Sequence, residues 1–126
     1  MTIANSFLAM AERVEQAGPE QQRELLGDAW ELIAPLAFGP LCADRAARFD
    51  SLLDAEGFES AALLLVPDGW GYMVAAHDTG PEAFAAGCFP FEGDEAGQCG
   101  ALARAAGLAI GAAALRAHVD LMETAA

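Results

Sequence analysis

The chain has no lysine: its six basic residues are all arginines, set against 19 aspartates and glutamates, and the formal net charge at pH 7 is −13. The imbalance is greatest between Arg48 and Arg104, where ten carboxylates occur without an arginine. A field of this sign repels DNA, RNA and anionic lipid headgroups and attracts basic protein surfaces. We therefore expect a protein partner with a basic surface, no direct nucleic acid and no membrane, unless the charge serves only to keep an alanine-rich chain in solution.

Cysteine is scarce and long apolar runs are missing. The three cysteines form an odd set without the spacing of a disulfide framework, which is typical of a reducing compartment. The longest apolar segment, residues 105–115, is too short to span about 30 Å of hydrocarbon. No basic region precedes an apolar run at the N-terminus, so no signal peptide is predicted. We expect a cytoplasmic protein with its cysteines reduced.

The chain also lacks recognisable catalytic motifs. None of its three serines lies in a nucleophile elbow, no glycine-rich nucleotide loop is present, and His77, Cys88 and Cys99 are too widely spaced for a zinc site. Cys88 is predicted to lie in the core. Cys99 is placed near a helix N-terminus, which can stabilise a thiolate, but the surrounding carboxylates oppose that effect. His118 is expected near a helix C-terminus, where a positive charge is favoured. We predict no enzyme, no catalytic residues, no metal and no cofactor.

Apolar residues at helical spacing predict three helices in the first half of the chain. The first carries Ile3, Phe7, Met10 and Val14 inward, the second starts at Pro19 and ends in a loop over residues 35–40, and the third covers residues 43–55. Residues 60–66 fit either a buried strand or a short helix. The alanines there favour a helix, with Ser60 as its cap and Pro67 as its end.

The second half predicts two strands and a long terminal helix. The strands cover residues 71–77 and 83–91, and the helix covers residues 98–122. Glycines at 100, 107 and 111 indicate close packing of this helix on the sheet. The fold class is therefore α+β, a single domain over residues 1–126 in which a short antiparallel sheet packs against helices. Two strands alone are marginal, so we expect either a third strand or a homodimer.

Three segments resemble the phage ABA sandwich domain, a family of small phage and prophage proteins: LAMAERVEQAGPEQQRELL at 8–26, SAALLLVPDGWGY at 60–72 and LAIGAAALRAH at 108–118. The middle segment is the most specific. The chain departs from the family in its longer segment 34–55 and in the glycines of its last helix. The resemblance implies an ABA-sandwich-like fold and a phage or prophage origin in a bacterial host, and it implies no activity.

The leading functional hypothesis is a non-enzymatic protein that binds another protein, as an inhibitor of a host nucleic-acid-binding or defence protein of the anti-CRISPR or DNA-mimic type. The alternatives are a homo-oligomeric phage structural or assembly protein, and an enzyme whose site would be a concave pocket with convergent polar groups. Aromatic residues beside carboxylates are typical of binding patches, although they also anchor cores. The predicted partner-binding residues are Asp68, Trp70, Tyr72, Glu82, Glu92, Asp94 and Glu95.

Overall fold

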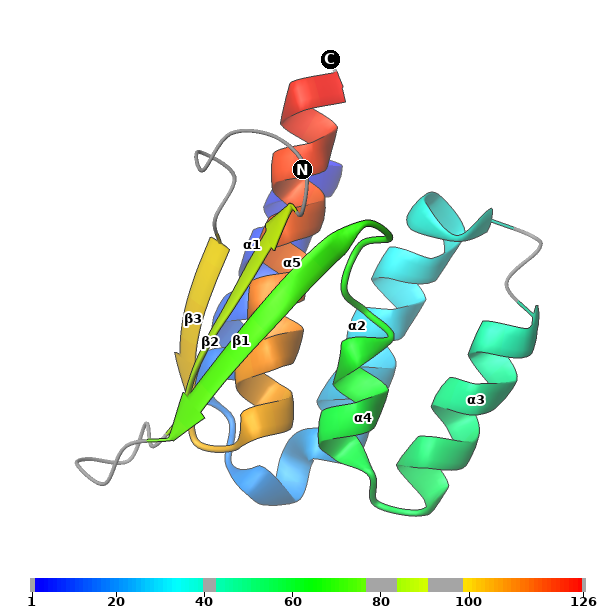
Figure 1. Ribbon diagram of the computed structural model, residues 1–126, viewed down its shortest axis with the longest axis vertical. Coiled ribbons are helices and arrows are strands. Elements are labelled where there is room, and N and C mark those ends of the chain that lie inside the picture. The colour runs from blue at the N-terminus through cyan, green and yellow to red at the C-terminus, as the bar shows by residue number, and fades with distance from the viewer. Residues whose placement is uncertain (1, 40–42, 77–83, 91–98, 126) are drawn as a thin grey trace.

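The computed structural model describes residues 2–39, 43–76, 84–90 and 99–125. It confirms an α+β fold in which helices pack against a short antiparallel sheet (Figure 1). In chain order the elements are α1 Ile3–Gln16, the 3-10 helix η1 Pro19–Gln21, α2 Gln22–Ala37, α3 Ala43–Asp54, α4 Phe58–Leu63, β1 Trp70–Ala76, β2 Phe84–Pro90, β3 Cys99–Ala103 and α5 Ala106–Ala125.

The sheet has the order β1-β2-β3, and neighbouring strands are antiparallel. In the register of β1 with β2, Tyr72 lies opposite Cys88 and Val74 opposite Ala86. The predicted alternation of these strands is therefore confirmed, and it places these four residues on one face. This inner face lies against α5, while Figure 1 shows no described helix on the opposite face.

The third strand corrects the prediction that residues 98–122 form one helix. Ala101 and Ala103 are buried whereas Gly100 and Leu102 are exposed, which is the period of a strand. Because alanine is common in helices and most of these side chains are small, the period was not visible in the sequence. A sheet of two strands alone would be marginal, and β3 is the third strand that was expected as one of the two solutions.

Helix α5 is the centre of the molecule. From Leu108 to Val119 every residue except Arg116 is buried, although an isolated surface helix would bury only one stripe. The sheet contacts one side of α5, and α1, α2 and α4 contact the rest (Figure 1). Its alanines and glycines are short enough to let so many elements approach at once.

The glycines of α5 mark its closest contacts, and these contacts are with helices. A Cβ on Gly107 would lie 3.1 Å from the backbone carbon and oxygen of Phe58 in α4, and one on Gly111 would lie 2.9 Å from Cδ2 of Leu26 in α2. Close packing at these positions is confirmed, but the expected neighbour was the sheet. Gly100 belongs to β3 and was wrongly placed in the helix.

Three predictions about the first four helices are wrong. Helix α2 continues through Pro35 to Ala37, and the helix tolerates the proline because both Pro35 and Glu31, whose carbonyl loses its donor, are exposed. Residues 58–63 are helical as favoured, but the N-cap is Gly57 and Ser60 lies inside the helix. Ile3 was expected in the core and is 55% exposed.

The outer edge of β3 is closed by an ion pair. Glu15 of α1 and Arg116 of α5 pair with each other; Arg116 also donates to the carbonyl oxygen of Gly100 at 2.9 Å, and Glu15 accepts from the backbone nitrogen of Leu102 at 3.3 Å. The arginine lowers the pKa of Glu15 from its ordinary value of 4.5. Two backbone groups of an edge strand thus gain partners that a second strand would otherwise supply.

Candidate functional site

The structure describes three of the predicted partner-binding residues, and they lie in one short segment. Asp68 is exposed in a turn that Gly69 completes with φ +81°, and the turn closes with a hydrogen bond of 3.1 Å from the Trp70 nitrogen to the Pro67 oxygen. Trp70 is half-buried and packs against the core, as expected of an aromatic residue that anchors a core. Tyr72 is 45% exposed. The remaining four, Glu82, Glu92, Asp94 and Glu95, lie outside the described residues.

Arg45 of α3 joins this turn to the end of α4. Its guanidinium donates to the carbonyl oxygens of Leu64 at 2.6 Å and Val66 at 3.2 Å, and to Oδ1 of Asp68 at 2.8 Å. It also lies 3.7 Å from the centre of the Phe38 ring. One arginine therefore satisfies carbonyls at a helix end, where intrahelical donors are missing, and pairs with the predicted site residue Asp68.

The side chain of His118 lies near Arg45 in space and is only 4% exposed. Its Nε2 lies 2.7 Å from the carbonyl oxygen of Leu65. Because a carbonyl oxygen can only accept, Nε2 carries the proton, and in the neutral ring Nδ1 is then an acceptor. Burial lowers the pKa of His118 from its ordinary value of 6.5, and the nearby Arg45 acts in the same direction. His118 was expected to carry a positive charge near a helix C-terminus. It is instead a buried imidazole whose neutral form is favoured.

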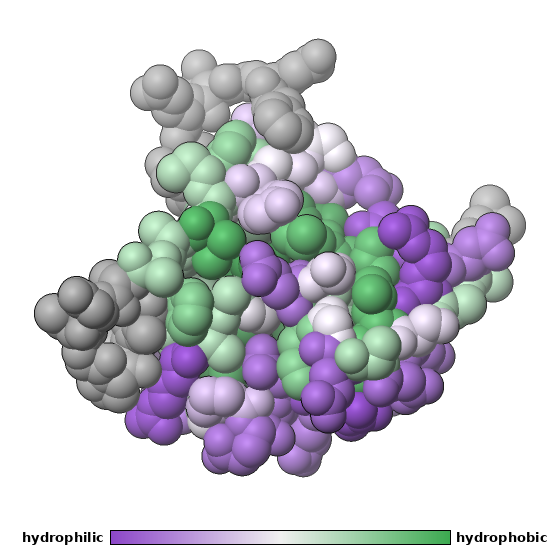
Figure 2. Space-filling model, turned by 60° about the horizontal axis from the view of Figure 1, so that its bottom comes forward, coloured by the Kyte–Doolittle hydropathy of each residue, from purple (hydrophilic) through white to green (hydrophobic). Residues whose placement is uncertain are grey.

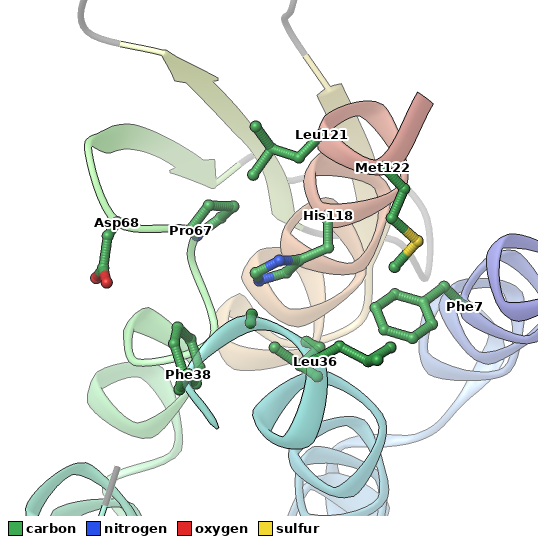
Figure 3. A pocket seen from close by; sticks show the side chains of 10 residues that line it. Phe7, Leu36, Phe38, Pro67, Asp68, His118, Leu121 and Met122 are labelled. Atoms are coloured by element: carbon green, nitrogen blue, oxygen red, sulfur yellow. The ribbon is translucent and has the colours of Figure 1, made fainter. Parts of the chain in front are cut away.

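A cavity of about 340 Å³ opens beside His118, between the ends of α2 and α5 and the start of α1 (Figure 3). Figure 3 shows the imidazole extending from α5, with the aromatic rings of Phe7 and Phe38 on either side of it. These rings meet the imidazole edge-on at centroid distances of 6.4 and 6.0 Å. The walls are mostly apolar: Phe7, Ile33, Leu36, Ala37, Phe38, Pro67, Asp68, His118, Leu121 and Met122.

The composition of this cavity suits apolar contact better than covalent chemistry. Its lining includes no serine, threonine or cysteine, and the carboxylate of Asp68 is 82% exposed and already paired with Arg45. A nucleophile beside a base, which covalent catalysis needs, is not found among these lining residues. Sequence reasoning missed the cavity because Phe7 was assigned to the core and Phe38 to a loop. A histidine within an almost uninterrupted apolar helix was the available signal.

A second feature is an acidic end of the molecule, formed by Glu20, Glu24, Asp54, Glu56 and Glu59, all of them exposed. Figure 1 shows the start of α2, the end of α3 and the start of α4 together at its lower edge. An ion pair of 3.3 Å between Arg23 and Asp54 links two of these helix ends. Figure 2 turns this end toward the viewer and shows hydrophilic residues over much of it.

The two described cysteines differ from each other in their surroundings. Cys88 is fully buried as predicted, and burial raises the pKa of its thiol to about 12. Cys99 lies in β3 rather than at a helix N-terminus, and burial raises the pKa of its thiol as well. The predicted position of Cys99 near a helix N-terminus is therefore wrong. Among the described side chains, no group of three or more His, Cys, Asp or Glu residues could hold a metal ion.

Comparisons with known proteins add no relative: no family model, no curated protein and no solved structure matches the chain. The resemblance to the phage ABA sandwich domain, and the origin that it implies, stay predictions. Within residues 2–39, 43–76, 84–90 and 99–125, no helix combines the length and the apolar character needed to cross a membrane.

Proposed function

We propose that the protein acts by binding another protein through its acidic end, and that the partner's matching surface is a basic one used for nucleic acid. In this role the chain is an inhibitor of a nucleic-acid-binding or defence protein of its bacterial host. The observation that carries the proposal is the gathering of five exposed carboxylates, to which Arg23 is the only residue linked by an ion pair in the described part of the chain. Carboxylates held on helix ends present fixed negative charge, as a phosphate backbone does.

The distribution of the ion pairs supports this proposal. Arg13, Arg45 and Arg116 pair with acids away from the acidic end, namely Asp28, Asp68 and Glu15. The chain has no lysine with which to neutralise the rest. A cluster that keeps most of its charge attracts a basic partner over about a Debye length, roughly 10 Å at 0.1 M salt.

The experiment is a tagged pull-down from a nuclease-treated bacterial lysate, followed by elution with rising salt and identification by mass spectrometry. We expect a nucleic-acid-binding protein that is released as salt rises, and whose DNA complex the purified chain displaces. Binding that is unchanged between low and high salt would contradict the charge-based mode.

Two fourfold variants with equal net charge locate the surface. The first neutralises the acidic end through E20Q, E24Q, E56Q and E59Q. The second neutralises exposed acids elsewhere through E12Q, E31Q, D44N and E123Q. At roughly 0.2–1 kcal/mol per exposed charge pair, the four changes of the first variant should lower the affinity by about fourfold or more, while the second variant should change it little. Equal losses in both would show that net charge, and not the acidic end, determines binding.

A further inference from the structure

The cavity beside His118 is lined by a polar group that is both buried and incompletely bonded. Nε2 of the imidazole is bonded to the carbonyl oxygen of Leu65, but Nδ1 has no hydrogen-bond partner among the described residues. No fully buried side-chain nitrogen or oxygen of these residues is left without a partner. Nδ1 therefore borders accessible space, and the cavity supplies that space because the imidazole lines it (Figure 3).

The bond to Leu65 determines what Nδ1 can bind. Since the proton of the neutral ring is on Nε2, Nδ1 offers a lone pair and accepts a hydrogen bond. Burial lowers the pKa of His118, so the ring does not readily take a second proton. The two charged side chains that act on the ring, Arg45 and Asp68, pair with each other at 2.8 Å. A ligand that fits these groups is neutral and carries a donor.

The walls and the volume of the cavity determine the shape of that ligand. The rings of Phe7 and Phe38 and the thioether of Met122 contact aromatic molecules favourably. A cavity of about 150 Å³ lined by leucine, isoleucine and phenylalanine is sufficient for benzene. This cavity is about 340 Å³, so it has room for two fused rings. It also lies within the range of roughly 300–1,000 Å³ that is typical of small-molecule sites.

We propose that this cavity binds a neutral aromatic compound of two fused rings, whose single N–H or O–H group donates to Nδ1 of His118. The apolar walls supply contact area, and the imidazole supplies the one directional bond that distinguishes this ligand from a plain hydrocarbon. The inference is independent of the proposed function, because none of the five carboxylates of the acidic end lines the cavity.

The experiment compares indole with benzofuran, two probes of nearly the same shape. Benzofuran has a ring oxygen where indole has its N–H donor. In methyl NMR spectra of methionine-labelled protein, both probes should shift the signal of Met122, which lines the cavity, and leave that of Met73 on β1 in place. Calorimetry should give indole a dissociation constant below about 1 mM. Indole should bind roughly 3- to 10-fold more tightly than benzofuran, because only indole can donate to Nδ1.

Two measurements assign the hydrogen bond to His118. In nitrogen NMR spectra of histidine-labelled protein, indole should move the Nδ1 signal of His118 more than benzofuran does. His118→Phe keeps a ring in the cavity wall and removes the acceptor, so the preference for indole should disappear. This variant also loses the bond to Leu65, and if it does not fold, the nitrogen spectra of the parent protein decide the assignment.

A matched pair of substitutions locates the site. Met122→Trp fills part of the cavity and should weaken both probes by about tenfold or more. Met73→Trp makes the same change at a 64% exposed position that does not line the cavity, and this control should bind as the parent does. The proposal is overturned by the absence of a Met122 shift at about 1 mM indole, by equal binding of indole and benzofuran, or by equal effects of the two substitutions.

Discussion

Glycine and alanine are common on both sides of α5, but they have a different role on each side. On the helical side, Gly107 and Gly111 let α4 and α2 approach to contact distance, and the charges of these helices point outward. On the sheet side, glycine and alanine continue to the molecular surface, where no charge follows them. Small residues therefore accompany a tightly packed interior in one half and, in the other, a face that no described helix covers. The positions of the surrounding helices and strands, and not the residue types, distinguish these two roles.

The largest expected difference between the halves is in the removal of a leucine. Leu26 is fully buried beside α5, so Leu26→Ala should lower the free energy of unfolding by about 2–5 kcal/mol. Leu102 on the outer face is 48% exposed, and Leu102→Ala should change it by less than about 0.5 kcal/mol. Urea unfolding at low protein concentration measures both. Similar losses would show that the sheet is as tightly packed as the helices.

The second prediction adds a side chain in each half. Gly107→Val places atoms against the backbone of Phe58 and should lower the free energy of unfolding by about 1–3 kcal/mol. Gly100→Val meets only the Ala86 oxygen, at 3.7 Å, and valine suits a strand, so this variant should be neutral or slightly more stable. Thermal unfolding of the two variants makes the comparison, and a destabilised Gly100→Val would contradict it.

The third prediction concerns the pH dependence of the free energy of unfolding, which should differ between His118 and Glu15. The pKa of His118 is lowered, so the unfolded chain binds more protons and stability falls as the pH drops below about 6.5. The pKa of Glu15 is lowered from 4.5, so its contribution is present above that value and is lost as the pH falls further. Unfolding free energies measured from pH 7 to 3 should show both windows. His118→Gln should remove the upper one and Glu15→Gln the lower one, and an unchanged profile in either variant would refute that assignment.

The smallest expected effect is a gain within the helical half. A Cβ on Gly27 would have no atom within 4 Å, so this glycine in α2 serves no close approach. Gly27→Ala should raise the free energy of unfolding by about 0.4–1 kcal/mol, because alanine loses less conformational freedom in a helix. Circular dichroism on heating is sufficient to detect it. A loss of stability would mean that the position has a contact beyond those of the folded monomer.

More of the helical half than of the sheet half could be predicted from the sequence. Large apolar residues such as Phe7, Leu26 and Phe49 occur at helical spacing, and all three are buried. The segment 99–103 was missed because alanine and glycine contribute too little side chain to show a strand period. The cavity could not be predicted, since it depends on where α2 ends, and Pro35 suggested a loop there. The pairing of Arg45 with Asp68, at 2.8 Å, joins residues whose separation in the sequence gives no local signal.

Arg45 of α3, which donates to the carbonyls at the end of α4, has a consequence for how the protein unfolds locally. Helix α3 is held by the guanidinium of Arg45, by the stacking of Phe49 on Trp30 at 4.7 Å and by the exposed Arg23–Asp54 pair. Phe49 and Leu53 also reach the core, but among the described elements α3 packs mainly on α4. We therefore expect α3 to detach in a partial unfolding event before the rest of the protein melts. Detachment would leave the carbonyls of Leu64 and Val66 without their donor and would free the Phe38 ring of the cavity wall. Access to the cavity and hydrogen exchange in α3 should therefore rise and fall together.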